Sequence, residues 1–134
     1  MDQNLILGKL RKTRLLPLFY KDDVDTSKNL INALISTNLN VIEFTNRGAD
    51  AKKIFPKLLD HVQDKNEVVL GIGSIKSSKE AKLFIDQGAK FIVSPHLDKK
   101  IGEVCNKNEV LWVPGCGTLS EMIKADKIGA KLIK

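Results

Sequence analysis

The segment that decides the fold is residues 41–48, which read VIEFTNRG. On a β-strand, period-2 alternation places Glu43, Thr45 and Arg47 on one face and Phe44 on the other. A buried carboxylate without a partner is costly, so a purely structural strand gives no reason for Glu43. Two interpretations are open: an edge strand with a solvated polar face, or a strand that carries an acid into a functional site.

Similar apolar segments recur on both sides of this one and alternate with helical patterns. Ser77 and Thr118 each begin a capping-box sequence, in which a Glu follows three residues later, and Gly88 and Gly129 mark helix ends. Pro56 interrupts one helical pattern, so that helix either begins near residue 55 or bends there. The predicted strands are residues 14–20, 41–48, 68–74, 91–95, 110–115 and 130–134.

Six strands alternating with five helices predict a parallel α/β sheet with right-handed crossovers. The pattern suits a (β/α)8 TIM barrel and a doubly wound sheet equally well, and six strands are two fewer than a closed barrel needs. We expect residues 1–134 to form a single domain.

The composition excludes several classes of function. The net charge is +6, but only three of the 22 basic residues are Arg and the lysines are scattered, so we expect no nucleic-acid partner. No segment has the pattern of a signal peptide or a membrane span, and we expect a cytoplasmic protein with no membrane partner. Cys105 and Cys116 are predicted to be reduced thiols, and no metal-ligand spacing is present.

In a parallel α/β fold, functional residues lie at the carboxyl ends of the strands. Lys134 falls at such an end and shares strand parity with Leu132, so on an inward face its amine would be surrounded by aliphatic carbon. Desolvation there favours the neutral, nucleophilic amine. The alternative is a frayed, solvated lysine. The other residues at these ends include Glu43, Thr45, Arg47, Ser74, Pro95, His96 and Cys116.

Five segments taken together resemble one known family, the KDPG/KHG aldolases. They are residues 43–47 (EFTNR), 71–74 (GIGS), 91–95 (FIVSP), 114–121 (PGCGTLSE) and 129–134 (GAKLIK). These enzymes are class I aldolases acting on 2-keto-3-deoxy-6-phosphogluconate and 4-hydroxy-2-oxoglutarate. The resemblance runs in order over nearly the whole chain, and it implies a (β/α)8 barrel, usually a homotrimer.

The resemblance also implies an activity and the residues that perform it. A 2-keto-4-hydroxy acid is cleaved to pyruvate and an aldehyde, either glyceraldehyde 3-phosphate or glyoxylate, without a metal or an organic cofactor. Lys134 matches the Schiff-base lysine of the family and Glu43 its general acid/base. Arg47 and Ser74 match positions that hold the substrate carboxylate, with Ser74 standing where the family more often has Thr.

Two further positions belong to the expected substrate site. Pro95 matches a segment that lines the pyruvate pocket, and Thr45 is expected to be a substrate-binding residue. His96, which follows Pro95, stands where the family commonly has Gly.

The family sequence continues beyond its lysine into the last strands, which carry phosphate-binding loops. We therefore expect this chain to correspond to part of an aldolase, with weak or no activity by itself. Two alternatives are open. One is a non-catalytic α/β module that binds a small anion at the Arg47 and Gly71 loops. The other is a phosphate-binding barrel enzyme of another reaction type, such as an isomerase.

Overall fold

The structure is a computed structural model that describes residues 2–134, and it contains five parallel strands and six helices. The strands are β1 (Leu18–Phe19), β2 (Val41–Thr45), β3 (Val69–Gly73), β4 (Phe91–Ser94) and β5 (Leu111–Pro114). The helices are α1 (Gln3–Thr13), α2 (Val24–Ser36), α3 (Ala51–Val62), α4 (Ser78–Gln87), α5 (Lys99–Lys107) and α6 (Leu119–Ile128).

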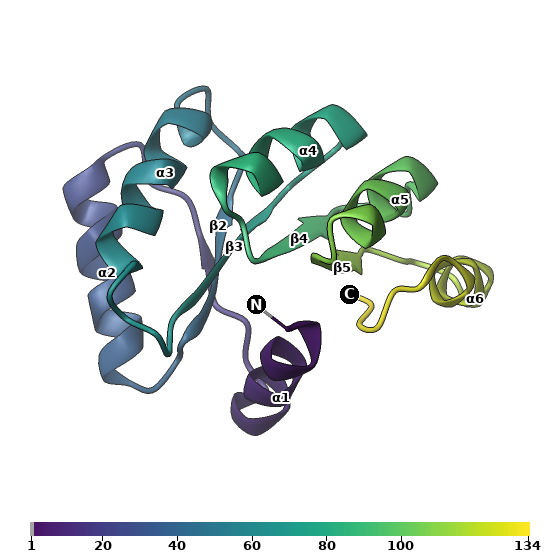
Figure 1. Cartoon of the computed structure of the whole chain (residues 1–134), viewed down its shortest axis with the longest axis horizontal. Helices are drawn as coiled ribbons and strands as arrows, with labels where there is room; N and C mark the ends of the chain where they lie inside the picture. The colour runs from purple at the N-terminus through teal and green to yellow at the C-terminus, as the bar shows by residue number, and fades with distance from the viewer. Residues whose placement is uncertain (1) are drawn as a thin grey trace.

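The sheet follows the chain, because its strands lie in the order β1-β2-β3-β4-β5. Figure 1 shows α2, α3, α4, α5 and α6 in succession around the convex side of the curved sheet. Helix α1 and the carboxyl end of the chain lie on the concave side. The architecture is therefore an incomplete (β/α) barrel, one of the two arrangements that the sequence pattern allowed and the one that the family resemblance implied. No helix among the described residues is long and apolar enough to cross a membrane.

The interpretation of residues 41–48 as an edge strand is wrong, because β2 lies between β1 and β3 and all five of its residues are buried. Phe44 faces outward into the core beneath the helices. Its ring centroid lies 5.4 Å from that of Phe19 and 6.4 Å from that of Phe55. Burying one such side chain contributes about 1.5–3 kcal/mol. Since Phe44 is fixed outward, Glu43 must face inward.

A second core lies inside the barrel, where α1 covers the inner face of the sheet. Ile6 and Leu7 of α1 contact inward-facing residues of four strands, which are Val41, Val69, Phe91, Val93, Leu111 and Val113. Inward and outward residues therefore alternate along the strands. The apolar inner core occupies the end of the barrel covered by α1.

Most of the predicted helix boundaries are confirmed. Gly88 and Gly129 end α4 and α6 with φ of 111° and 100°, a left-handed conformation that favours glycine. Thr118 and Glu121 form a complete capping box. At α4 the Ser77 hydroxyl accepts from the Glu80 N–H, but the Glu80 carboxylate accepts from the backbone of Lys76 instead of Ser77.

Pro56 lies inside α3, so the expectation that this helix begins near residue 55 is wrong. Proline has no N–H to donate to the carbonyl four residues earlier, that of Lys52. The side chain of Gln87 donates to this carbonyl instead, with Nε2 3.0 Å from the oxygen. A residue at the end of α4 thus supplies the hydrogen bond that Pro56 removes.

The expected counts of six strands and five helices are wrong at both ends of the chain. Helix α1 was not predicted. Its N-cap is Asp2, whose side chain accepts from the Asn4 N–H. The first strand is only Leu18–Phe19, because α1 ends at Thr13 with Arg14 as its C-cap and the following residues connect it to the strand. Residues 130–134 form no strand, although the backbone of Lys134 is hydrogen-bonded to Pro114 at the end of β5 and to Cys116 just after it.

Candidate active site

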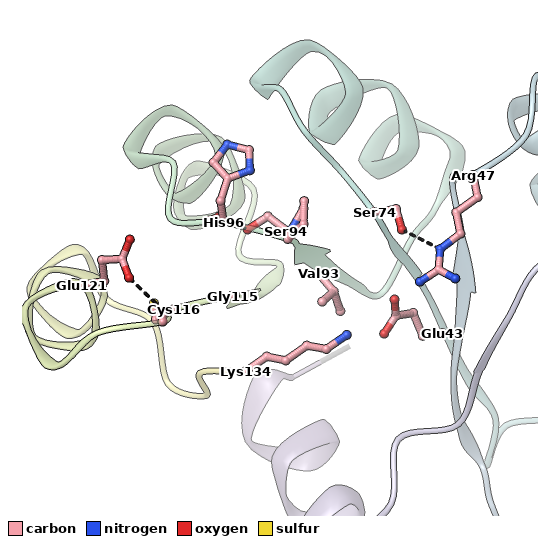
Figure 2. Close-up of a pocket in the computed structure, with 12 residues that line it drawn as sticks. Glu43, Arg47, Ser74, Val93, Ser94, His96, Gly115, Cys116, Glu121 and Lys134 are labelled. Carbon is pink, nitrogen blue, oxygen red and sulfur yellow. Dashed lines mark hydrogen bonds between the residues drawn. The ribbon is translucent and has the colours of Figure 1, made fainter.

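A cavity of about 550 Å³ opens at the carboxyl ends of the strands, and Figure 2 shows the residues around it. It is lined by Glu43, Arg47, Ser74, Val93, Ser94, Pro95, His96, Gly115, Cys116, Gly117, Glu121 and Lys134. These residues come from the ends of β2, β3, β4 and β5, from the start of α6 and from the last residue of the chain. Parallel strands bring their carboxyl ends to one edge, so residues far apart in sequence meet here.

Glu43 is the buried acid of this cavity, with only 2% of its surface exposed. Its Oε2 atom is buried and has no hydrogen-bond partner. Burial raises the pKa of the Glu43 carboxyl, and the positive charges of Lys134 and Arg47 oppose part of that effect. A raised pKa is the direction of shift that suits a carboxyl group to act as a general acid/base.

Lys134 is held at the cavity by its backbone. Its N–H donates to the Pro114 carbonyl at 2.9 Å, and its carbonyl accepts from the Cys116 N–H at 2.8 Å. In Figure 2 its side chain extends across the cavity with the amine pointing toward the Glu43 carboxylate. Contrary to the expected aliphatic surrounding, Lys134 is exposed. Among the described residues, both hydrogen bonds of the Lys134 backbone go to the end of β5 and the turn that follows it.

Arg47 and Ser74 lie on one side of the cavity, at the ends of β2 and β3 (Figure 2). The Arg47 Nε donates to the Ser74 hydroxyl at 3.4 Å, which orients the guanidinium. Ser74 has a φ of 60°, in the left-handed region that is uncommon for residues other than glycine. This backbone turn directs the hydroxyl toward Arg47.

The opposite side of the cavity is formed by two turns in close contact. The Gly115 N–H donates to the Ser94 carbonyl at 2.8 Å. A Cβ atom at Gly115 would lie 2.5 Å from the Pro95 carbonyl oxygen, so only glycine fits. The exposed side chains of Pro95 and His96 follow at the cavity rim.

Glu121 is a lining residue that the sequence reasoning treated only as part of a helix cap. Its Oε2 accepts from the Gly117 N–H at 2.8 Å, the Thr118 N–H at 3.0 Å and the Thr118 hydroxyl at 3.1 Å. The Gly117 and Thr118 hydrogen bonds lower the pKa of the Glu121 carboxyl. A capping box directly after a strand places its carboxylate at the barrel mouth, and this signal was available in the sequence.

The expected site residues do not all meet at the cavity. Lys134, Glu43, Arg47, Ser74 and Pro95 line it together. Thr45 does not, because its side chain is fully buried toward β1 and donates to the Phe19 carbonyl at 3.4 Å.

The cavity also holds a thiol, that of Cys116, whose pKa is raised by partial burial and by the nearby Glu121 carboxylate. A raised pKa leaves the thiol protonated and weakly nucleophilic at neutral pH. Among residues 2–134, no three or more His, Cys, Asp or Glu side chains are grouped as metal ligands would be.

The cavity combines an amine, a buried acid and an oriented guanidinium. An amine can add to a carbonyl, a buried carboxyl can move protons, and a guanidinium can bind a carboxylate. At the carboxyl end of an α/β barrel, these are the groups that Schiff-base chemistry on a keto acid requires.

Comparison with known families identifies the chain. The family model "KDPG and KHG aldolase" matches residues 6–134, and the chain belongs to that family. It is 26% identical over 129 residues to the 2-dehydro-3-deoxy-phosphogluconate aldolase of Treponema pallidum, covering 96% of this chain and 60% of that protein. It is 22% identical over 119 residues to the KHG/KDPG aldolase of Escherichia coli K12, covering 89% of this chain and 54% of that protein.

Solved structures of aldolases of this family are also similar to the chain. A 4-hydroxy-2-oxoglutarate/2-dehydro-3-deoxyphosphogluconate aldolase superposes with a TM-score of 0.81 at 27% identity, covering 92% of this chain and 60% of that one. The KDPG aldolase of Legionella pneumophila, with pyruvate captured as a covalent carbinolamine, gives a TM-score of 0.77 at 23% identity. That match covers 85% of this chain and 54% of the Legionella chain, and it supports the shared fold.

Proposed function

We propose that the protein carrying this chain is a class I aldolase that cleaves a 2-keto-4-hydroxy acid to pyruvate and an aldehyde. The observation that carries the proposal is the Lys134 amine, which points toward the buried Glu43 carboxylate in a cavity that also contains Arg47. Candidate substrates are 2-keto-3-deoxy-6-phosphogluconate and 4-hydroxy-2-oxoglutarate, since relatives that act on these compounds share the fold and the family.

Lys134 is the nucleophile in this proposal. Its neutral amine attacks the C2 ketone to form a carbinolamine, which loses water to become a cationic imine. Removal of the proton from the C4 hydroxyl then breaks the C3–C4 bond and releases the aldehyde. The electron pair of that bond enters the imine and gives an enamine. Protonation at C3 and hydrolysis of the imine release pyruvate and regenerate the amine.

Glu43 moves the protons in these steps. It gives a proton to the leaving hydroxyl of the carbinolamine, and as a carboxylate it accepts the proton of the C4 hydroxyl. It then returns a proton to C3 of the enamine. These steps need both the protonated and the ionised form of Glu43. Burial in the wall of the cavity raises the pKa of Glu43 and so makes the protonated form more accessible.

Arg47 and Ser74 hold the carboxylate of the keto acid. A guanidinium can donate two parallel hydrogen bonds to a carboxylate, which fixes the orientation of the ketone as well as its position. The bond from Arg47 Nε to the Ser74 hydroxyl leaves the terminal nitrogens of Arg47 available for the substrate. Pro95 and the turn that follows β4 form part of the pocket wall.

We infer a cytoplasmic homotrimer from the family resemblance. The outer surface of α6 supports an assembly, because Leu119 and Ile123 are 73% and 47% exposed, which is unusual for large apolar side chains grouped on one helix. Light scattering coupled to gel filtration would measure the number of subunits.

Trapping with borohydride tests the aldolase proposal. The intact protein is mixed with pyruvate and sodium borohydride, and the modified residue is located by mass spectrometry. We expect a reduced pyruvate adduct on Lys134. K134R should give no adduct, while K131R is a matched control that should be labelled as the wild type is. An intact, folded protein that forms no adduct at Lys134 contradicts the proposal.

A second candidate function is a non-catalytic module that binds a small carboxylate. The exposure of Lys134 favours it, because Arg47 and Ser74 are oriented without any contact to the amine. This candidate predicts that pyruvate raises the melting temperature equally in the wild type and in K134A, with no turnover by either. Loss of that stabilisation in K134A would favour the aldolase.

A further inference from the structure

The inner face of β3 lacks side chains where the other strands present them. Period-2 alternation directs Val69, Gly71 and Gly73 into the barrel, and Leu70 and Ile72 toward the outer helices. Val69 belongs to the apolar inner core, so the bare surface begins at Gly71 and ends at Gly73, one residue before Ser74 at the cavity. Glycine weakens a strand interior, so such a surface calls for an explanation.

Each of the two glycines is covered by a different side chain. A Cβ atom at Gly71 would lie 2.4 Å from the ring of Phe91, which crosses from β4. A Cβ atom at Gly73 would lie 1.6 Å from Oε1 of Glu43 and 2.4 Å from its carboxyl carbon. No real Cβ approaches so closely, so Glu43 occupies the volume that a side chain at position 73 would fill.

The position of Glu43 depends on this volume, because the alternatives are closed. The Cα atoms of Glu43 and Gly71 are paired across the ladder, and the space above Gly71 is already filled by Phe91. The opposite face of β2 is packed by Phe44 and Ile42 in the outer core. A carboxylate displaced from Gly73 therefore has open space in the cavity, on the side of Lys134 and Arg47.

We propose that Gly73 is a positioning residue of the active site, which holds the Glu43 carboxylate against β3 by having no side chain. The catalytic consequence of this positioning rests on the proposed function, whereas the steric contact between Gly73 and Glu43 does not depend on it. A side chain at position 73 pushes the acid toward the Lys134 amine. A closer ion pair with the amine favours its protonated form, which is not nucleophilic, and the carboxylate no longer occupies the position from which it transfers protons.

The kinetic test uses the exchange of the pyruvate methyl protons with deuterium, followed by NMR on the intact protein. This exchange needs imine formation and proton transfer but no aldehyde. For G73A we expect the maximal exchange rate to fall by about 10²-fold or more, the usual contribution of a positioned acid or base. The pyruvate concentration for half-maximal rate should change less than about 3-fold, since Arg47 is untouched.

A stability cycle separates this role from a general packing defect. G73A should lower the melting temperature of the wild type by about 1–3 °C, because the overlapping atoms belong to the end of a flexible side chain that can move into the cavity. In an E43A background, where the overlapping carboxylate is absent, the loss should be less than half as large. G102A is the matched control, because a Cβ atom at Gly102 would lie 2.5 Å from the Trp112 ring in the outer core, and its loss should be the same in both backgrounds.

The outcomes are distinguishable. Equal losses of melting temperature for G73A with and without Glu43, or an exchange rate in G73A within about 3-fold of the wild type, would overturn the role of Gly73. Absence of exchange in the wild type would instead contradict the aldolase proposal, and the stability cycle would still report on the contact between Gly73 and Glu43.

Discussion

The indole Nε1 of Trp112 donates a hydrogen bond to the Ser94 hydroxyl at 3.0 Å, and that hydroxyl donates in turn to the His96 carbonyl at 2.9 Å. Trp112 belongs to the core between the sheet and the outer helices, whereas Ser94 and His96 line the cavity. One buried hydroxyl therefore connects the packing of the barrel exterior to the turn at the rim of the cavity.

Replacing Ser94 by Ala should destabilise the protein and loosen this turn. The Trp112 N–H is buried and would lose its acceptor, which typically costs about 1–3 kcal/mol in the free energy of unfolding. Urea denaturation followed by fluorescence measures this directly, because Trp112 is the single tryptophan. S36A is a suitable control, since the Ser36 hydroxyl bonds to the Ala33 carbonyl at an exposed position. A loss for S94A no larger than for S36A would contradict the prediction.

Glu43 should make the stability of the protein depend on pH in a direction opposite to that of most carboxylates. Burial raises the pKa of Glu43 in the folded state above its ordinary value of 4.5. At a pH between the ordinary pKa and the raised pKa of the folded state, the folded protein binds more protons than the unfolded one, so stability falls as pH rises. The stabilisation by protonated Glu43 is fully present below the ordinary pKa and is lost as pH rises through the pKa of the folded state.

Urea denaturation of the wild type and E43Q across this pH range measures the effect. E43Q should lack the loss at higher pH, so the difference between the two proteins should grow as pH rises. E121Q is a control of opposite sign, because hydrogen bonds lower the pKa of Glu121 and its stabilisation should be lost as pH falls. Parallel curves for the wild type and E43Q would contradict the prediction.

The orientation of β2 could be predicted from sequence because alternation is a local property. Once Phe44 is placed outward, Glu43 must face inward, and the parallel topology alone gathers the carboxyl ends of the strands. The contact of Glu43 with Gly73 could not be predicted, since it depends on how two strands twist against each other. The exposure of Lys134 was likewise missed, because strand-like composition in residues 130–134 does not supply the neighbouring strands that would bury it.

The ends of the chain show a second limit of local patterns. Helix α1 was overlooked because only Ile6 and Leu7 are buried in it, too few for a clear helical periodicity. Pro56 was correctly marked as a difficulty, but its solution lies on another helix. Only the folded structure brings the Gln87 side chain to the Lys52 carbonyl that proline leaves without its usual donor.

Ser74 should show separate effects on stability and on ligand binding when it is replaced by Ala or Gly. Its φ of 60° is unfavourable for any residue with a Cβ, by roughly 1–2 kcal/mol. S74G relieves this strain and S74A does not, so S74G should be the more stable of the two by about 1 kcal/mol. Both variants lose the hydroxyl that accepts from Arg47, so both should bind pyruvate more weakly by a similar factor, about 2- to 10-fold.

Denaturation curves and calorimetric titration with pyruvate measure the two effects of the Ser74 variants independently. Glu109 provides the control, because it has a φ of 55° in the turn before β5 and does not line the cavity. E109G should be more stable than E109A, as at position 74, while both bind pyruvate as the wild type does. If S74G bound pyruvate as tightly as the wild type while S74A did not, the left-handed backbone at position 74, and not the hydroxyl, would be the feature that orients Arg47.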